Sequence, residues 1–384
     1  MDAASLDAWL TLHRLHGIGP RLAARILEAY ADPAEFLAAS DTERARRGLP
    51  ASAVAARASA SIRAGVAADR RWAERAGHHI ITRSDPRYPA ALRHIDQPPS
   101  VLFIAGDPAL LAGPQIAVVG TRKPSRGGIA AAEAFAGHLA SAGLTVTSGL
   151  AQGIDAAAHE GALLAPAGTT IAVMASGPEH HYPRDNARLA GEIAGAGALV
   201  TEMPVGTPLT RGLFPRRNRL IAGLALAVVV IEAGRRSGAL NTARLALEQG
   251  REVMAMPGSI HSPVSKGCHA LIRDGAGLVE DATEVIDAIR GVIPLATPAS
   301  PAPAGPDQAA CAGTAAPPRD HLDAEQQALL EAMGFDPIGF ESLARRTSLT
   351  PERLSSMLLG LELTGHVAPC NGGHYMQIGN RAGG

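Results

Sequence analysis

Three short segments hold the residue types and spacings that could do chemistry in this chain. Residues 148–155 read Ser-Gly-Leu-Ala-Gln-Gly-Ile-Asp and stand between an apolar run and an Ala-rich run. A turn from strand to helix exposes backbone N–H groups that no helical carbonyl accepts, and the helix dipole adds partial positive charge there. Residues 120–125 and 237–242 repeat the pattern. Each segment predicts a phosphate-binding turn, although a tight turn that merely needs glycine is the alternative for any one of them.

Four arginines within nine positions add positive charge to this prediction. Residues 211–219 read Arg-Gly-Leu-Phe-Pro-Arg-Arg-Asn-Arg and lead directly into the apolar segment 220–231. A solvated charged loop is the usual explanation for such a run, but Phe214 and the apolar segment should hold this one against the core beside the turns. Guanidinium groups placed there can bind phosphates bidentately. Several phosphate sites with arginines between them predict a nucleic-acid strand followed along its backbone.

The composition narrows the class of protein further. The formal net charge is −1 over 384 residues, so a nucleic-acid site must be a local patch and not a basic coat. Aromatic residues form 3% of the chain, so base stacking is expected to contribute less than phosphate contacts. Three scattered cysteines, an acidic N-terminus and a longest apolar run too short to span a bilayer predict a cytoplasmic protein without a signal peptide or membrane span.

Asp155 and His159, four residues apart on one predicted helix, are the candidates for acid–base chemistry. The favoured interpretation is structural: Asp155 caps the helix, and His159 bonds to it or to a neighbouring loop. No nucleophile or metal-binding spacing accompanies the pair. The adjacent residues Cys268 and His269 would point in different directions from a helix, so they are not expected to act together. We predict no catalytic residue and no metal site.

The elements that must position these residues alternate strictly from residue 115 to about 290. Apolar runs predicted as strands are each followed by a helical segment; the runs are Ile116–Val119, Leu144–Thr147, Thr170–Met174, Ala198–Thr201, Ala225–Ile231 and Glu252–Ala255. Residues 227–231 are apolar on both faces, as parallel strands covered by helices on both sides are. This pattern predicts an α/β fold with a Rossmann-like doubly wound sheet, in which ligands bind beyond the carboxyl ends of the strands. The G-x-G-x-x-G and Walker A spacings are missing, which argues against NAD and ATP.

Other segments flank this α/β domain, which we place at 79–290. Residues 1–78 have helical periodicity, and Gly17-Ile18-Gly19-Pro20 resembles the turn of a helix-hairpin-helix, although a turn without a ligand explains it equally well. Residues 291–318 are rich in Pro and Ala and are expected to be a flexible linker. Residues 319–384 contain three helical patterns and then a hairpin around Asn371-Gly372-Gly373, which predicts a winged helix-turn-helix domain.

The order and spacing of these motifs resemble the DNA-processing protein A (DprA) family over roughly residues 80–290. The resemblance rests on segments 118–122, 148–155 with His159, Tyr182-Pro183 with Asn186, 214–223, 230–233, 237–240 and Pro257-Gly258. It implies a bacterial recombination mediator that binds and protects single-stranded DNA during natural transformation and loads the RecA recombinase onto it. It also implies a SAM-like or helix-hairpin-helix domain at residues 1–78, a homodimer formed through the Rossmann-like domain, no nucleotide cofactor and no catalysis.

The turns, the arginine run and the resemblance together predict which residues form the site. The expected DNA-binding residues are Gly120, Thr121, Arg122, Ser148, Gly149, Gly153, Arg216, Arg217, Asn218, Arg219, Ser237, Gly238 and Lys266. Asp155, His159 and Glu232 are expected to support the fold or line the pocket. Arg219 is the riskiest assignment, because it could pair instead with Glu202 or Glu232 and stabilise the fold.

Two other functions stay open at the level of sequence. One is a Rossmann-like nucleotide phosphoribohydrolase, but the Pro-Gly-Gly-x-Gly-Thr turn of those enzymes is not matched by the nearest segment, 234–238. The other is a regulator that reads duplex DNA through the winged helix. In the predicted helix 350–363 Arg353 is the one basic residue, which is poor for groove binding. A comparison of single-stranded, duplex and nucleotide ligands separates the three functions.

Overall fold

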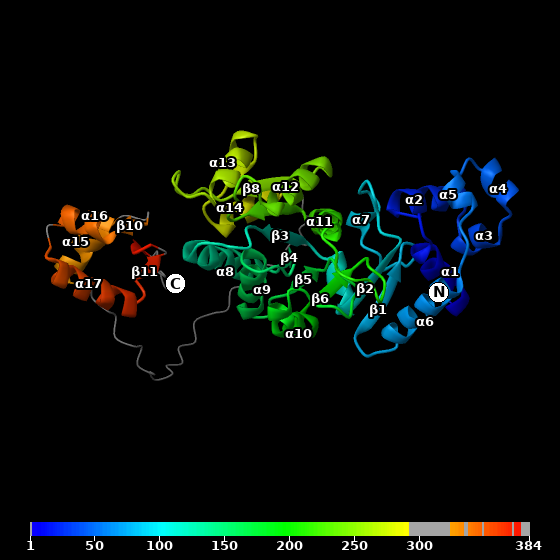
Figure 1. Cartoon of the computed structure of the whole chain (residues 1–384), viewed down its shortest axis with the longest axis horizontal. Coiled ribbons are helices and arrows are strands. Elements are labelled where there is room, and N and C mark those ends of the chain that lie inside the picture. The colour runs from blue at the N-terminus through cyan, green and yellow to red at the C-terminus, as the bar shows by residue number, and fades with distance from the viewer. Residues whose placement is uncertain (1, 292–322, 334–336, 348, 371, 378–384) are drawn as a thin grey trace, which may run out of the picture. The chain divides into compact units, whose positions relative to one another are not determined.

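A computed structural model describes residues 2–291, 323–333, 337–347, 349–370 and 372–377 (Figure 1). The chain divides into two compact units, Met1–Pro294 and Leu295–Gly384, and each is described by itself. The predicted linker 291–318 lies outside the described residues beyond Gly291, as do the two ends of the predicted C-terminal domain. None of the helices in the described parts of the chain is long and apolar enough to cross a membrane.

One sheet of nine strands organises the first unit, in the order β1-β2-β6-β5-β4-β3-β7-β8-β9. The strands are β1 His78–Thr82, β2 Val101–Gly106, β3 Gln115–Val119, β4 Thr145–Ser148, β5 Thr170–Val173, β6 Ala198–Thr201, β7 Ala227–Val230, β8 Glu252–Ala255 and β9 Gly277–Leu278. Strands β3 to β9 run parallel, whereas β2 joins β6 antiparallel and carries β1 at the sheet edge. All six predicted strands are confirmed within one or two residues at their ends.

Helices cover both faces of this sheet, as the predicted double winding requires (Figure 1). One layer contains α8 Arg126–Ser141, α9 Ile154–Leu164, α10 Ala187–Ala196 and α14 Ala282–Ile289, and the other contains α7 Ala90–Arg93, α11 Leu213–Leu224, α12 Gly238–Glu248 and α13 Lys266–Arg273. Alternate residues of β3 enter different cores: Ile116 and Val118 pack with α8, and Ala117 and Val119 pack with α11. All four are buried, which explains the unbroken apolar run. Two 3₁₀ helices, η1 Pro108–Ala112 and η2 Arg184–Asn186, complete the connections.

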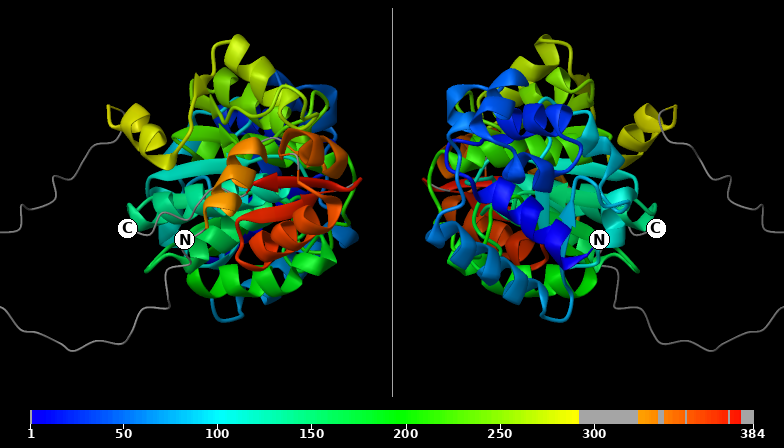
Figure 2. Two further views of the ribbon diagram at one scale, coloured as in Figure 1. Left: turned by 90° about the vertical axis from the view of Figure 1, so that its left-hand side faces the viewer. Right: turned by 90° about the vertical axis from the view of Figure 1, so that its right-hand side faces the viewer.

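The predicted N-terminal helices stack on one end of the sheet (Figure 2, right). They are α1 Ala3–Arg14, α2 Pro20–Ala29, α3 Pro33–Ala38, α4 Asp41–Arg46, α5 Ala51–Val54 and α6 Ala60–Ala73. Their core continues into β2 through Phe103. Polar contacts fasten them as well, because Arg14 pairs with the buried Asp69 at 2.6 Å and donates to the Val205 carbonyl at 2.8 Å. These helices therefore belong to the same compact unit as the sheet.

The second unit has the helices and hairpin of a small winged domain. It contains α15 Ala324–Met333, β10 Ile338–Gly339, α16 Phe340–Thr347, α17 Pro351–Leu363, β11 Val367–Cys370 and β12 His374–Gln377. The three strands lie in the order β10-β12-β11. Leucines 343, 354, 358 and 361 form its buried core. The predicted helices and hairpin are confirmed, and the short strand β10 is an addition that the sequence pattern did not indicate.

Candidate nucleic-acid interface

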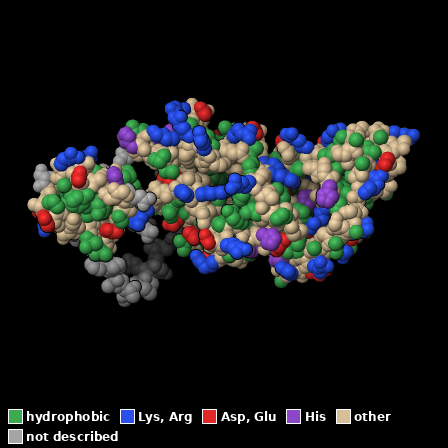
Figure 3. Space-filling model, in the orientation of Figure 1, with side chains coloured by type: hydrophobic (Ala, Val, Ile, Leu, Met, Phe, Trp, Pro, Cys, Tyr) green, Lys and Arg blue, Asp and Glu red, His purple; other side chains and the backbone are tan. Residues whose placement is uncertain are grey.

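A cavity of about 600 Å³ opens at the carboxyl ends of the neighbouring strands β3 and β7. The chain changes direction there, since β4, β5 and β6 follow one another on one side of β3 while β7 and β8 lie on the other. Open α/β sheets bind ligands at such a point, because the loops diverge from it. The first and third predicted turns, α11 and segment 263–264 line the cavity. Figure 3 shows Lys and Arg side chains in a band across the middle of the first unit, between the two helix layers.

The first turn is already occupied by a carboxylate of the chain itself. Glu232, which follows β7, accepts hydrogen bonds from Ser125 N–H at 2.9 Å and from Ser125 Oγ at 2.6 Å. Ser125 Oγ also accepts from Gly128 N–H at 3.0 Å and so caps α8. A Cβ on Gly128 would lie 2.5 Å from the Glu232 carboxyl, so only glycine permits this approach. The start of α8 thus has an internal negative partner, while residues 120–122 still line the cavity.

The second turn is closed in the same manner by Asp155 and His159. The Asp155 carboxylate accepts from Gly149 N–H at 3.2 Å, and His159 Nε2 accepts from Leu150 N–H at 3.3 Å. The Thr170 hydroxyl donates to the Val146 carbonyl, so His159 Nδ1 must donate to Thr170 Oγ1 at 2.7 Å. Both ring nitrogens are therefore engaged in the neutral form. Burial lowers the pKa of His159 to about 3 and raises the pKa of Asp155, although Arg217 opposes the rise at Asp155.

The predicted contact of His159 with a neighbouring loop is thus present, whereas the predicted helix cap by Asp155 is wrong in detail. The N-cap of α9 is Gly153, with φ +84°, and not Asp155. Asp155 lies in the first turn of the helix and folds back onto the preceding loop. In two of the three predicted phosphate-binding turns, backbone N–H groups consequently donate to a carboxylate or an imidazole of the protein itself.

The third turn has no carboxylate partner in the part of the chain that the structure describes. Ser237 caps α12: its Oγ accepts from Ala239 N–H at 3.3 Å, and its carbonyl accepts from Leu240 N–H at 3.2 Å. A Cβ on Gly238 would meet nothing within 4 Å, so the start of α12 faces open space. The Nδ2 of Asn241, a residue that also lines the cavity, is buried without a hydrogen-bond partner. This helix start is where an external anion can bind.

Arg217 brings a buried positive charge to the same cavity. Its side chain is 5% exposed; one terminal nitrogen donates to the Val173 carbonyl at 2.6 Å, and Nε has no partner. Burial lowers its pKa to about 10, which leaves it charged at neutral pH. The nearby Asp155 carboxylate opposes this lowering, but no salt bridge joins the two side chains. A buried guanidinium with an unpartnered N–H group is costly, so it favours a bound anion as a further partner. Arg122 adds an exposed charge at the cavity mouth, 5.0 Å from the centre of the Phe214 ring.

Comparison with known proteins places this geometry in a family. Residues 79–290 match the family model described as DNA recombination-mediator protein A, and residues 313–373 match the DprA winged helix domain. The chain belongs to the DprA family. It is 39% identical to Protein Smf of Escherichia coli (strain K12) over 312 residues, which cover 79% of this chain and 78% of that protein. It is 41% identical to DNA processing protein DprA of Bacillus subtilis (strain 168) over 212 residues, covering 55% and 71%.

Two solved DprA structures are similar as well. DprA of Streptococcus pneumoniae superposes with a TM-score of 0.64 and 33% identity, over 73% of this chain and 97% of that one. DprA of Helicobacter pylori superposes with a TM-score of 0.51 and 28% identity, over 56% and 96% of the two chains. The H. pylori structure is described as giving insight into the single-stranded DNA binding mode of that protein.

In this DprA family member, the arginines that were predicted to act together lie on different faces of α11. Arg217 and Asn218 line the cavity together with Arg122. Arg219 points away from it and pairs with the buried Glu202, which also receives Arg216 Nε at 3.1 Å. The helix turns these adjacent residues toward different neighbours, so Arg216 and Arg219 do not line the cavity. The alternative pairing of Arg219 with Glu202 is what the structure contains.

Several other predicted DNA-binding residues make contacts within the protein itself. Ser148 is fully buried and donates to the Val118 carbonyl at 2.7 Å. A Cβ on Gly149 would overlap the Arg217 guanidinium, and one on Gly153 would lie 2.5 Å from the Thr121 carbonyl, so both glycines permit close packing. The Lys266 ammonium group donates a hydrogen bond to the Ile260 carbonyl, and Lys266 does not line the cavity. Ser237 and Gly238, like residues 120–122, do line it.

The sequence prediction also missed residues of the cavity wall. Arg236 stands immediately before the α12 cap, and Pro263 and Val264 come from the segment between β8 and α13. Arg236 could have been included, because it adjoins the predicted turn at 237. No local pattern indicates Pro263 or Val264, since their place depends on how the loop after β8 folds back across the sheet edge.

Proposed function

We propose that this protein binds single-stranded DNA at the cavity between β3 and β7, protects incoming strands and loads the RecA recombinase onto them in natural transformation and homologous recombination. The observation that carries the proposal is that Arg217, which is buried and whose Nε has no hydrogen-bond partner, lines the same cavity as the open start of α12. The family's description as a recombination mediator supports the role, and we propose that the protein carries it out in the cytoplasm.

The chemistry of the cavity supports a strand over a compact anion. Arg217 and the start of α12 offer one phosphate position inside the cavity. Arg122, which is exposed at the cavity mouth, offers a second positive charge there. A ligand that reaches both must carry successive negative charges, as a DNA backbone does. A likeness to the H. pylori protein, whose structure is described in terms of single-stranded DNA binding, supports the same ligand.

We propose further that the protein acts by binding and without turnover. Asp155 and His159 are the residues of suitable type nearest the cavity, and their polar atoms are engaged by the turn 149–150 and by Thr170. The winged unit is a poor candidate for duplex DNA, since Arg353 of α17 pairs with Glu325 at 2.7 Å. Both observations favour the strand-binding function over the hydrolase and the regulator.

A homodimer through the α/β domain completes the proposal. Strand β9 lies at the sheet edge opposite β1, and its Leu278 is half exposed. Exposed strand edges with apolar side chains pair readily with another copy. Light scattering should give twice the 39.4 kDa chain mass, and Leu278→Lys should shift the protein toward the monomer. A monomeric mass at all concentrations of the unaltered chain contradicts the dimer.

The test of the function compares three ligands in one anisotropy assay: a labelled single strand, the same sequence as duplex, and a nucleoside monophosphate as competitor. We expect tight, sequence-tolerant binding of the single strand that weakens steeply with salt, because several phosphate contacts release counter-ions. A preference for duplex, an affinity independent of salt, or hydrolysis of the nucleotide that Asp155→Ala abolishes would each overturn the proposal.

A further inference from the structure

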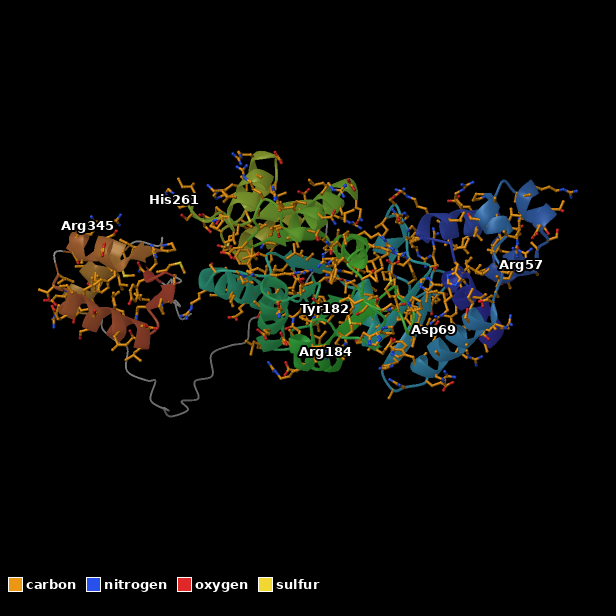
Figure 4. All side chains as sticks on the ribbon, in the orientation of Figure 1. Arg57, Asp69, Tyr182, Arg184, His261 and Arg345 are labelled. Atoms are coloured by element: carbon orange, nitrogen blue, oxygen red, sulfur yellow. The ribbon has the colours of Figure 1, made fainter. Side chains whose placement is uncertain are left out.

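Tyr182 is the one aromatic side chain among the large exposed apolar residues of the described chain. It is 46% exposed, whereas Trp9, Trp72, Tyr30, Tyr88, Phe36, Phe103 and Phe135 are all buried. It lies in the loop between β5 and η2, beside Arg184 (Figure 4). A single exposed aromatic residue is ordinary on a protein surface, so the case for a ligand depends on where this ring lies.

The ring stands directly beside the anion cavity. Its centroid is 5.9 Å from that of Phe214 at an interplanar angle of 60°, and the Arg122 guanidinium lies over Phe214. A notch of about 30 Å³ is lined by Tyr182, Pro183, Gln152 and Gly149, and it shares Arg122, Ala151 and Phe214 with the larger cavity. Phe214 is therefore the wall between the two. If the phosphate of one nucleotide lies in the cavity, the base of the adjacent nucleotide can reach the notch.

Two hydrogen bonds to the second turn hold the loop that carries Tyr182 in place. Asn186 donates to the Leu150 carbonyl at 2.9 Å, and Gln152 donates to the Asp185 carboxylate at 2.9 Å. Both bonds tie the loop to the closed second turn, which Asp155 and His159 fix in turn. The ring is thus a positioned platform, and a base that stacks on it does not have to order the loop first.

We infer that Tyr182, supported by Phe214, is a stacking platform for an unpaired nucleobase next to the phosphate in the cavity. The inference rests on the proposed function and adds a base contact to it. Stacking on an aromatic face tolerates any base but requires that the base be free of a partner strand. The platform therefore contributes selection of single strands over duplex, which phosphate contacts alone do not provide.

The experiment measures two strands of equal length and phosphate number, an oligothymidylate and a fully abasic strand, with the full chain. The unaltered protein should bind the oligothymidylate more tightly. Tyr182→Ala should weaken that binding by about tenfold, leave the abasic affinity within about twofold and leave the salt slope unchanged. Tyr182→Phe should keep the preference, because the stacking face is retained. Leu164→Ala, at a more exposed apolar residue at the C-terminal end of α9, is the control and should change neither affinity.

A second readout uses 5-iododeoxyuridine in the strand and irradiation, which links the base to a stacked aromatic ring. Peptide mapping should recover Tyr182 from the linked complex. Equal affinity of the unaltered protein for both strands, an equal loss of both in Tyr182→Ala, or linkage elsewhere would overturn the platform and leave the proposed function standing. Failure of the unaltered protein to bind either strand would overturn the proposed function itself.

Discussion

Arg122 and Arg217 hold their charges in different surroundings within one cavity. Arg122 is exposed at the mouth, whereas Arg217 is buried and held by the Val173 carbonyl. In the sequence, Arg217 cannot be told from Arg216 or Arg219, because which residue faces the cavity depends on the rotation of α11 about its axis. The sequence could therefore predict the cluster but not its division between the cavity and Glu202.

The first prediction concerns those two cavity arginines. Arg122→Ala and Arg217→Ala should each weaken single-strand binding by a similar factor for all sequences, because each removes a phosphate contact. Each should also lower the salt slope by roughly one unit. Binding isotherms at several salt concentrations give both quantities. Unaltered affinity and slope in both variants would mean that DNA binds to another surface.

Arg219→Ala should act on stability instead. The change leaves Glu202, which is buried, with Arg216 as its remaining partner, and should cost about 3 kcal/mol of unfolding free energy. The salt slope of the folded fraction should stay unchanged. Chemical denaturation measures the loss, with Arg244→Ala in the exposed pair with Glu248 as the control, expected to cost less than about 1 kcal/mol. A reduced salt slope in Arg219→Ala would return this residue to the DNA site.

His159 predicts a loss of stability in mild acid. Its pKa is lowered by burial to about 3 in the folded protein, so the unfolded chain binds the proton first as pH falls through about 6.5. The stability contributed by the neutral ring is complete above that pH and declines toward pH 3, by about 2 kcal/mol between pH 7 and pH 5. Burial lowers the pKa of His13 as well, which adds to the same slope.

Denaturation at a series of pH values measures this loss. His159→Gln should flatten the pH dependence, and the exposed His261→Gln should leave it unchanged. An equal slope in the His159 variant and the unaltered protein would show that other groups carry the acid sensitivity.

At the level of elements, the strands were predictable because a strand covered on both faces must be apolar throughout, as 227–231 is. That pattern and the strand–helix alternation predict a doubly wound sheet with its ligand beyond the carboxyl ends of the strands, but they do not give the order of the strands. What the pattern did not indicate is that Glu232 and Asp155 satisfy two of the three helix-start turns. The Ser125–Glu232 contact joins residues 107 positions apart and depends on the arrangement of the neighbouring strands β3 and β7. The Gly149–Asp155 contact spans six residues and depends on the backbone path of the turn.

Gly149 gives a prediction at the same scale. Alanine there would place a methyl group on the Arg217 guanidinium, so Gly149→Ala should displace that side chain and weaken DNA binding about as much as Arg217→Ala does. Calorimetric unfolding measures any loss of stability, and anisotropy measures the loss of DNA affinity, so the two effects can be separated. Gly191→Ala in α10 is the matched control, because its Cβ would meet nothing within 4 Å, and it should leave affinity unchanged. Full binding by Gly149→Ala would show that Arg217 need not occupy its present position.

At the scale of the whole molecule, the cavity is built entirely from the first compact unit. A chain ending at Arg290 should therefore fold and bind single-stranded DNA, since every residue that lines the cavity precedes that point. Circular dichroism, thermal unfolding and anisotropy test this directly. Loss of the fold or of all DNA binding would contradict the predicted domain division.

The open start of α12 has a consequence for how a strand is held. Since carboxylates of Glu232 and Asp155 already bind N–H groups of the other two turns, the proposed site would bind one phosphate in the cavity and meet the neighbouring nucleotides at its surface. A strand anchored at single points keeps most of its length accessible between them. A filament-forming protein could then assemble on the free stretches and remove the anchors one at a time, without having to compete against a continuous groove.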